Sequence, residues 1–432
     1  MREWVAGDPL VIERGEGVRL YDTEGRAYYD GVSSLWLNLH GHRVPRLDAA
    51  VRAQLDRLAH STFLGLTHPP GIRLAEELLA IAPPGLARVF YSDNGATAAE
   101  IAVKMAFQYW RHRGELGRTR FVTLENAYHG DTIGAVSVGG VEIFHAIFRP
   151  LLFQVYRAPS PYCYRCLHNG ESPAGCRQEC LTGMEEILAR HPGEIAAAIV
   201  EPRLQGAGGM IAAPDGFLRG VRELTRRYDV LLIADEVATG FGRTGRMFAC
   251  EHEDVSPDLM CLAKGITGGY LPLAATLATE EIYEAFLGEH SEMKTFFHGH
   301  SYTANPLACA VAIANLEIFR EEGVIEGLPP KIELIRERLA AMRHLPFVGD
   351  VRQAGFMCGI ELVRDKKTKE PFPVEERAGA KVCQAARERG LLIRPLSDVV
   401  VFMPPLGSSP AELGEMLEIL AAALRCGDGE GN

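Results

Sequence analysis

A short apolar run that ends in two acidic residues constrains the fold of this chain most strongly. Residues 230–234 read Val-Leu-Leu-Ile-Ala, and Asp235 and Glu236 follow at once. An unbroken apolar run of this length is typical of a strand that is buried on both faces of an α/β sheet. Ligands of such sheets bind just beyond the carboxyl ends of the strands. Asp235 is therefore expected at a binding site, where a buried carboxylate needs a cationic partner.

A second run supplies a candidate for that partner. Residues 259–263 are apolar, and Lys264 follows them in a glycine-rich stretch that continues to Gly269. Burial lowers the pKa of a lysine and makes its amine nucleophilic, which suits Schiff-base chemistry. Pyridoxal phosphate needs such a lysine, together with a carboxylate for its ring nitrogen. Taken alone, Asp235 or Lys264 is equally well explained as a solvated residue at the end of a strand.

Together the two runs resemble the class III aminotransferases, which have the aspartate-aminotransferase fold. Residues 235–245 read D-E-V-A-T-G-F-G-R-T-G and residues 264–269 read K-G-I-T-G-G, as in that family. The resemblance extends from about residue 8 to about residue 410. It implies a pyridoxal-phosphate enzyme with an α/β fold, in which a large domain contains a mainly parallel seven-stranded sheet and a second domain is smaller.

The domain boundaries follow from a change in character near residue 320, where charged helices and new strands begin. We expect the large, cofactor-binding domain at residues 46–322. The small domain is expected to combine residues 1–45 with residues 323–432.

Length and charge exclude several other classes of protein. The chain has 432 residues and a net charge of −11, so it lacks the basic footprint of a nucleic-acid-binding protein. No apolar run approaches the roughly 18 residues of a membrane span. The N-terminus also lacks the apolar core of a signal peptide. We therefore expect a cytoplasmic enzyme with no nucleic-acid or membrane partner.

A turn of small residues, Ser92–Thr97, precedes a helix expected at residues 98–110. The start of a helix presents free backbone N–H groups and binds phosphate readily, although the same residues also cap ordinary helices. The resemblance implies that Gly95 and Ala96 bind the cofactor phosphate through their backbone, with Thr97 as an additional hydroxyl donor.

A strand expected at residues 120–125 leads into Tyr128-His129-Gly130. The resemblance implies that Tyr128 stacks on the pyridine ring, whereas no chemistry is assigned to His129. Asp131 is expected to brace either Asp235 or the network beside the ring. Glu201, at the end of another apolar run, is interpreted as a hydrogen-bonding group near the site or as a structural residue.

Other motifs resemble the substrate side of this family. Residues 33–42, S-S-L-W-L-N-L-H-G-H, are similar to a segment of the diaminopelargonate synthases, a group within class III, and imply that Trp36 lines the substrate site. Arg394 is expected to follow a buried strand and to bind a substrate carboxylate, although a surface ion pair is the alternative. Gly299 is expected beside the substrate. Ser301 is expected to reach the cofactor phosphate of a partner subunit, which implies a homodimer with shared active sites.

The implied reaction is a transamination in biotin synthesis, in which a small-molecule amino donor aminates the keto acceptor 8-amino-7-oxononanoate to 7,8-diaminononanoate. The donor is S-adenosylmethionine or lysine. Leu35, Val401 and the cysteine-rich insertion favour lysine, because they depart from the pattern of the enzymes that use S-adenosylmethionine.

The family also carries an upstream aromatic segment that we expect before Met1. The alternative function is another class III transaminase that acts on ω-amino acids or polyamines. A non-catalytic relative is disfavoured because Lys264 is present.

Ten cysteines occur in the chain, and four of them, Cys163, Cys166, Cys176 and Cys180, crowd into one insertion. Their C-x2-C…C-x3-C spacing fits a zinc site, four reduced thiols in a surface loop or a disulfide pair formed on oxidation. Because transamination needs no metal, no metal ligand is assigned. The other six are expected to be mostly buried free thiols. They are Cys250, Cys261, Cys309, Cys358, Cys383 and Cys426.

Overall fold

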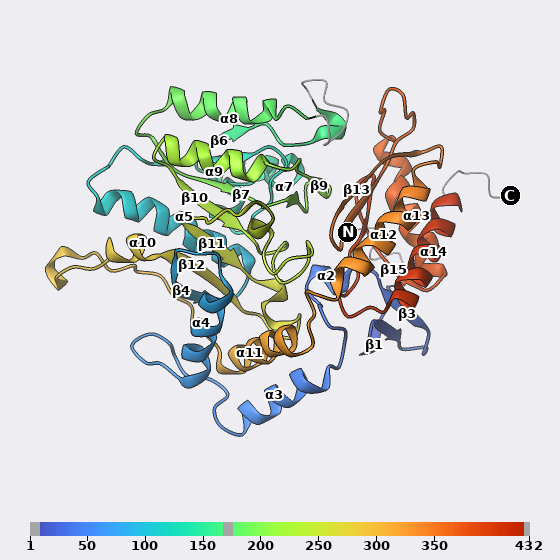
Figure 1. Ribbon diagram of the computed structural model, residues 1–432, viewed down its shortest axis with the longest axis horizontal. Helices are drawn as coiled ribbons and strands as arrows, with labels where there is room; N and C mark the ends of the chain where they lie inside the picture. The colour runs from blue at the N-terminus through green and yellow to red at the C-terminus, as the bar shows by residue number, and fades with distance from the viewer. Residues whose placement is uncertain (1–8, 167–175, 427–432) are drawn as a thin grey trace.

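A seven-stranded sheet with helices on both faces forms the larger part of the protein (Figure 1). The structure, a computed structural model, describes residues 9–166 and 176–426. The strand order is β4-β12-β11-β10-β7-β5-β6, and only β12 runs antiparallel to its neighbours. The strands are β4 (Leu86–Ser92), β5 (Arg120–Leu124), β6 (Tyr156–Ala158), β7 (Ile195–Val200), β10 (Leu231–Asp235), β11 (Leu259–Leu262) and β12 (Ala274–Thr279). The predicted mainly parallel seven-stranded sheet is confirmed.

Alternating residues of the central strands enter two separate cores. Ile233 of β10 packs in the cluster that includes α5 (Gly95–His112). Leu232 and Ala234 pack in the other cluster, with residues of α8 (Glu179–Arg190) and α9 (Phe217–Arg227). Successive side chains of a strand point to opposite faces, so both faces of this sheet are covered. This double coverage explains why β7 is apolar throughout and why β10 is apolar up to Asp235, its last residue.

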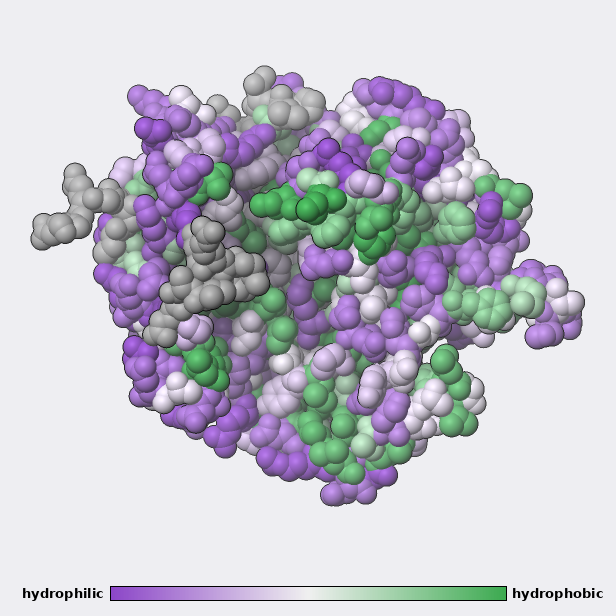
Figure 2. All heavy atoms as spheres, turned by 180° about the vertical axis from the view of Figure 1, so that it is seen from behind, coloured by the Kyte–Doolittle hydropathy of each residue, from purple (hydrophilic) through white to green (hydrophobic). Residues whose placement is uncertain are grey.

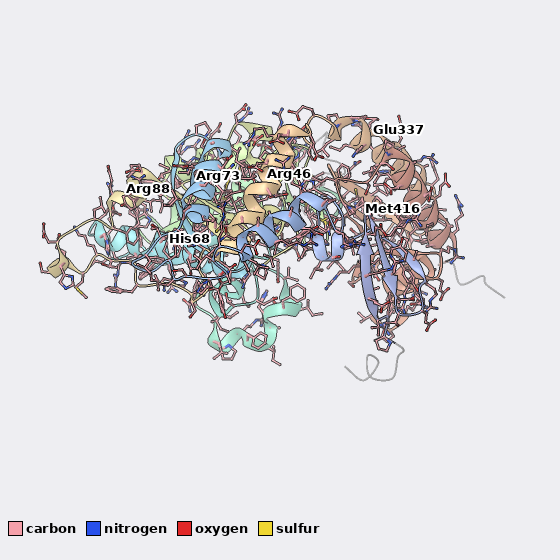
Figure 3. All side chains as sticks on the ribbon, turned by 90° about the horizontal axis from the view of Figure 1, so that it is seen from below. Arg46, His68, Arg73, Arg88, Glu337 and Met416 are labelled. Atoms are coloured by element: carbon pink, nitrogen blue, oxygen red, sulfur yellow. The ribbon has the colours of Figure 1, made fainter. Side chains whose placement is uncertain are left out.

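Further helices surround this sheet. They are α2 (Ser33–Trp36), α3 (Pro45–Leu55), α4 (Pro69–Ile81), α6 (Ile133–Ser137), α7 (Glu142–His145), α10 (Glu280–Glu284) and α11 (Pro306–Glu321). Arg46 of α3 and Arg73 of α4 both donate to Glu317 of α11, which ties the three helices together (Figure 3). Among the described residues, no helix is both long and apolar enough to span a membrane.

A second group of elements lies beside the large sheet (Figure 1). Its sheet has the order β13-β14-β17-β16, with strands β13 (Val348–Ala354), β14 (Met357–Leu362), β16 (Arg394–Leu396) and β17 (Val399–Phe402). Its helices are α12 (Leu328–Met342), α13 (Ala378–Glu388) and α14 (Pro410–Cys426).

The N-terminal residues join this second group through a sheet of their own. The strands β1 (Ile12–Glu16), β2 (Arg19–Asp22) and β3 (Ala27–Asp30) are antiparallel, and β3 pairs in parallel with β15 (Leu391–Leu392). This pairing brings residues 29–30 and 391–392, which are distant in sequence, together in space. The exact domain boundaries stay a prediction.

The segment after β6 forms a bridge between the two groups of elements. Arg165 donates to Glu361 of β14 at 2.6 Å, and Tyr162 donates to the same carboxylate. Arg352 of β13 also donates to Glu361, at 2.5 Å, and both side chains of this pair are less than 10% exposed. Glu361 therefore joins the bridge to the second sheet.

We predict that Glu361→Ala destabilises the protein by about 3–5 kcal/mol, because the substitution leaves the buried Arg352 without its main partner. The measurement is the shift of the chemical unfolding midpoint. As the control, Glu370→Ala removes a long surface ion pair and should change stability by less than about 1 kcal/mol. Equal shifts for the two variants would contradict the role assigned to Glu361.

Candidate active site

Parallel strands that lie side by side in the sheet end at one edge, and each is followed by a polar residue. Lys264 follows β11, Asp235 ends β10, Glu201 follows β7, and Tyr128 and His129 come after β5. Because β11, β10, β7 and β5 are neighbours in the sheet and run in the same direction, these five side chains converge.

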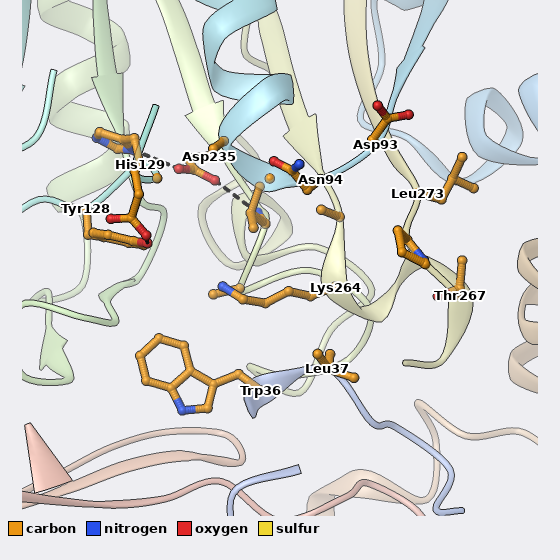
Figure 4. Close-up of a pocket in the computed structure, with 18 of the residues that line it drawn as sticks. Trp36, Leu37, Asp93, Asn94, Tyr128, His129, Asp235, Lys264, Thr267 and Leu273 are labelled. Atoms are coloured by element: carbon orange, nitrogen blue, oxygen red, sulfur yellow. Dashed lines mark hydrogen bonds and ion pairs between the residues drawn. The ribbon is translucent and has the colours of Figure 1, made fainter. Parts of the chain in front are cut away.

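All five line one cavity of about 690 Å³ (Figure 4). Most of the other lining residues are small or apolar. These include Trp36, Leu37, Gly95, Ala96, Ala207, Val237, Ala238, Ala263, Tyr270, Leu271, Pro272 and Leu273. A cavity of this size, with few convergent polar groups on an apolar lining, is typical of a cofactor or small-molecule site.

The direct partner of Asp235 is His129. His129 Nδ1 lies 2.7 Å from Asp235 Oδ2, and the backbone N–H of Val237 donates to Asp235 Oδ1 at 3.0 Å. Both side chains are nearly inaccessible to water, and His129 Nε2 is a buried polar atom without a hydrogen-bond partner among the described residues. Sequence reasoning missed this contact. The order of the strands, which places the residues after β5 close to β10, would have indicated it.

Lys264 faces the same carboxylate without a direct hydrogen bond. Burial lowers the pKa of its amine, whereas the negative charges of Asp235 and Glu201 oppose this shift. The amine lies 5.2 Å from the ring centre of Trp36, and Figure 4 shows Lys264 between Asp235 and Trp36. Desolvation is the larger effect, so the Lys264 amine gives up its proton more readily than a surface lysine does.

Glu201 is a buried acid with an unusual pKa. Its carboxylate accepts N–H bonds from Tyr128 at 3.0 Å and from Gly206 at 2.8 Å. Burial raises its pKa to about 7, even though His129 and these two N–H groups favour the ionised form. The sequence interpretation left Glu201 open between a site residue and a structural one. The structure places it in the lining of the cavity.

Tyr128 is held in place by its hydroxyl group, which donates to Asp131 at 2.8 Å. Burial raises the pKa of this phenol. The sequence predicts that Asp131 braces either Asp235 or the network beside the ring. The structure shows it bound to Tyr128, in the network beside the ring. Phe144 touches the Tyr128 ring with its edge, at 5.7 Å between ring centres.

The predicted phosphate turn lies at the start of α5, which begins at Gly95 rather than near residue 98. Asn94 caps the helix by accepting the N–H of Thr97 at 3.1 Å, and the Thr97 hydroxyl donates to the Asn94 carbonyl at 2.7 Å. Thr97 is therefore occupied with the cap. Gly95 and Ala96 line the cavity. At Gly95 a Cβ atom would lie 2.5 Å from Val237, so only glycine fits there without movement of a neighbour.

On the substrate side, Trp36 is buried against the cavity and Leu35 is not among its lining residues. Arg394 is separated by one residue from the end of strand β15 (Leu391–Leu392) and is itself the first residue of β16. Its role in binding a carboxylate stays a prediction. It pairs in register with Val401 of β17, so the two side chains share a face of the sheet. Val401 packs in the same cluster as Trp36, which places Arg394 toward that side of the site. The Arg394 side chain is exposed and lies outside the cavity lining.

Gly299 and Ser301 are exposed and do not line the cavity of their own chain. A Cβ atom at Gly299 would lie 3.2 Å from Leu64, and Tyr302 contacts His60 at 5.0 Å between ring centres. The segments at residues 60–66 and 297–302 therefore form one surface. Four apolar residues on it are exposed, namely Leu64, Leu66, Phe297 and Tyr302. Apolar side chains gather on several protruding parts of the face seen in Figure 2.

The model of the class III aminotransferase family matches residues 2–424. The chain belongs to this family. The adenosylmethionine-8-amino-7-oxononanoate aminotransferase of Geobacter sulfurreducens is 55% identical over 98% of this chain and 94% of that relative. The crystal structure of the enzyme of that name from Methanocaldococcus jannaschii is 47% identical, with a TM-score of 0.94 over 99% of this chain and 95% of that one. A PLP-bound amine transaminase from an uncultivated Pseudomonas species is 39% identical, with a TM-score of 0.92 over 98% of this chain and 96% of that one.

For this aminotransferase we predict that Glu201 makes stability depend on pH. In the unfolded chain the pKa of the Glu201 carboxyl is about 4.5, whereas in the folded protein this pKa is about 7. Between these values the folded state binds more protons, so this contribution to stability is lost as the pH rises.

The measurement is the thermal unfolding temperature from pH 5 to 8 for wild type and for Glu201→Gln. The unfolding temperature should decrease less with rising pH in Glu201→Gln than in wild type, whatever the absolute stability of the variant. The exposed Glu125→Gln serves as the control and should keep the wild-type slope. An unchanged slope in Glu201→Gln would show that Glu201 does not hold its proton in the folded state.

Proposed function

We propose that this aminotransferase transfers an amino group from adenosylmethionine to 8-amino-7-oxononanoate and gives 7,8-diaminononanoate, with pyridoxal phosphate as its cofactor. The observation that carries the proposal is the convergence of Lys264, Asp235 and Tyr128 in one buried cavity. Two relatives, similar over nearly the whole chain, bear the name of this activity. The PLP-bound form of a third supports the cofactor.

The residues of the cavity fit this cofactor. Gly95 and Ala96 would hold the phosphate at the start of α5, where N–H groups lack partners within the helix. Tyr128 would lie on the ring. Asp235 would keep a proton on the ring nitrogen, and its bond to His129 would fix its orientation. When bound, the cofactor supplies an electron sink for the carbon that carries the amino group.

Lys264 performs the proton transfers in this proposal. Its Nζ atom would bind the cofactor between turnovers and, once released by the donor, would move a proton to and from the α-carbon of the substrate. A lysine with an ordinary pKa would be protonated and could not accept that proton. Burial lowers the pKa of Lys264, which favours the neutral amine that this role needs.

Trp36, Arg394 and Gly299 are proposed for the substrate. Trp36 would pack on the apolar chain of 8-amino-7-oxononanoate, and Arg394 would bind its carboxylate after turning toward the cavity. The sequence features that favour a lysine donor carry less weight in the structure. Leu35 lies outside the cavity lining, and Val401 is buried in the cluster behind Trp36. Together with the names of the relatives, this supports adenosylmethionine.

A homodimer is proposed because Ser301 and Gly299 do not line the cavity of their own chain. They belong to the surface formed by residues 60–66 and 297–302, which exposes several apolar side chains. Covering this surface with a second copy of the chain would bury those side chains. It would also bring Ser301 to the phosphate of the partner's cofactor.

The proposed function is tested by a half-reaction. Enzyme loaded with pyridoxal phosphate is mixed separately with adenosylmethionine, lysine and a simple primary amine, and the visible absorbance of the cofactor is followed. We expect adenosylmethionine to remove this absorbance and 8-amino-7-oxononanoate to restore it. Loss of this absorbance with lysine alone would show that lysine, and not adenosylmethionine, is the amino donor. A response to the simple amine, without restoration by 8-amino-7-oxononanoate, would assign an amine transaminase instead.

Lys264→Ala supplies the matched variant for this test. It should retain less than about one-hundredth of the wild-type turnover, because the protein then lacks the group that moves the proton. Lys381→Ala, on the outer helix α13, should react like wild type. Comparable turnover in both variants would refute the role of Lys264.

Shared active sites predict that two inactive chains complement each other. Ser301→Glu should repel the partner's cofactor phosphate, and Lys264→Ala should disable its own site. A dimer with one chain of each kind keeps one intact site, so co-expressed chains purified through two different tags should show about half of wild-type activity. Sedimentation should give about twice the 47.3 kDa mass of one chain. A monomer, or an inactive mixed dimer, would contradict the proposal.

A further inference from the structure

The four cysteines of the insertion come together in space, although no proposed step of the reaction uses them. Cys163 and Cys166 lie at the ends of a short helical turn, and Cys176 and Cys180 lie at the start of α8. All four line a separate cavity of about 290 Å³. Residues 167–175, which connect the two pairs in sequence, lie outside the described residues.

The thiol groups interact with one another. The Cys163 and Cys176 side chains lie close enough to interact, and Cys166 and Cys180 also lie near Cys163. Burial and these neighbouring sulfurs raise the pKa of Cys163 to about 12 and that of Cys180 to about 11. The backbone N–H of Gln178 donates to Cys176 Sγ at 3.3 Å. None of the four forms a disulfide with another described cysteine.

We propose that this four-cysteine cluster binds one Zn²⁺ ion as a structural site. Four cysteines from two neighbouring segments are the ligand set of a structural zinc site, which is tetrahedral with Zn–S bonds of about 2.3 Å. A single disulfide would use only two of them. On binding, zinc takes the cysteines as thiolates and releases their protons.

Binding requires the sulfur atoms to move closer together. Among the described residues, no group of three or more Cys, His, Asp and Glu side chains stands ready to hold a metal ion. Two of the cysteines, Cys166 and Cys176, are only half-buried. Side-chain rotation there, on turns rather than inside a sheet, would close the cluster without a change in the fold.

The location of the site gives zinc a structural role. The turn that carries Cys163 and Cys166 also carries Arg165, whose contact with Glu361 joins the bridge to the second sheet. Just before this turn, Ser160 donates to Gln205, the neighbour of the Gly206 that binds Glu201. Zinc would thus fasten the turn to α8 and keep the bridge in place beside the active site.

The test is metal analysis of the full-length protein, purified without chelators from zinc-supplemented cells. We expect about one zinc per chain in the wild type. The double variant Cys163→Ser/Cys176→Ser should hold less than one-tenth of an equivalent. Cys383→Ser, a buried cysteine in α13, is the matched control and should keep its zinc.

Two further measurements use the wild-type protein, so that the test does not depend on whether the double variant folds. A mercurial that blocks thiols should release the zinc, as detected with a chelating dye. Replacement by Co²⁺ should give the sulfur-to-metal absorption of a tetrahedral thiolate site. Wild-type protein with less than one-tenth of an equivalent of zinc and four free thiols would overturn the proposal. A disulfide among these cysteines, found by mass spectrometry of non-reduced peptides, would also overturn it.

Discussion

The buried contact between Asp235 and His129 is the interaction on which the geometry of the site depends. A carboxylate at the end of a doubly covered strand has lost nearly all of its water, and it remains in place only if other groups compensate. His129 and the N–H of Val237 supply that compensation. Because the two carboxylate oxygens are thereby fixed, the electric field that acts on Lys264 is fixed as well.

The parallel sheet makes this contact possible. His129, Glu201, Asp235 and Lys264 are separated by up to 135 residues in sequence, yet neighbouring strands deliver them to one edge of the sheet. His129 and Asp235 are buried. Asp235 changes the pKa of Lys264 and of Glu201, and His129 changes that of Glu201, so the four groups are electrostatically coupled. Glu201 illustrates this coupling, because its raised pKa reflects burial together with the charges of His129 and Asp235.

The second group of elements completes the site from the other side. Trp36 packs against Val401 and Met403 of this part of the chain, and the bridge through Glu361 holds the two groups together. Arg394 belongs to the same sheet but is exposed. The groups proposed for the substrate are therefore less tightly constrained than those proposed for the cofactor, which lie at the edge of the rigid central sheet.

The sequence alone indicated the buried strands that carry the site and the identity of its chemical groups. Unbroken apolar runs mark these strands, and Asp235 and Lys264 stand out because a charge directly follows each run. Only the tertiary structure decided which groups touch. The partner of Asp235 is His129, Asp131 accepts a hydrogen bond from Tyr128, and Arg394 pairs in register with Val401. Four cysteines on two turns became one cluster in the same way. Contacts of this kind depend on strand order and side-chain direction, and a local pattern of residues carries information about neither.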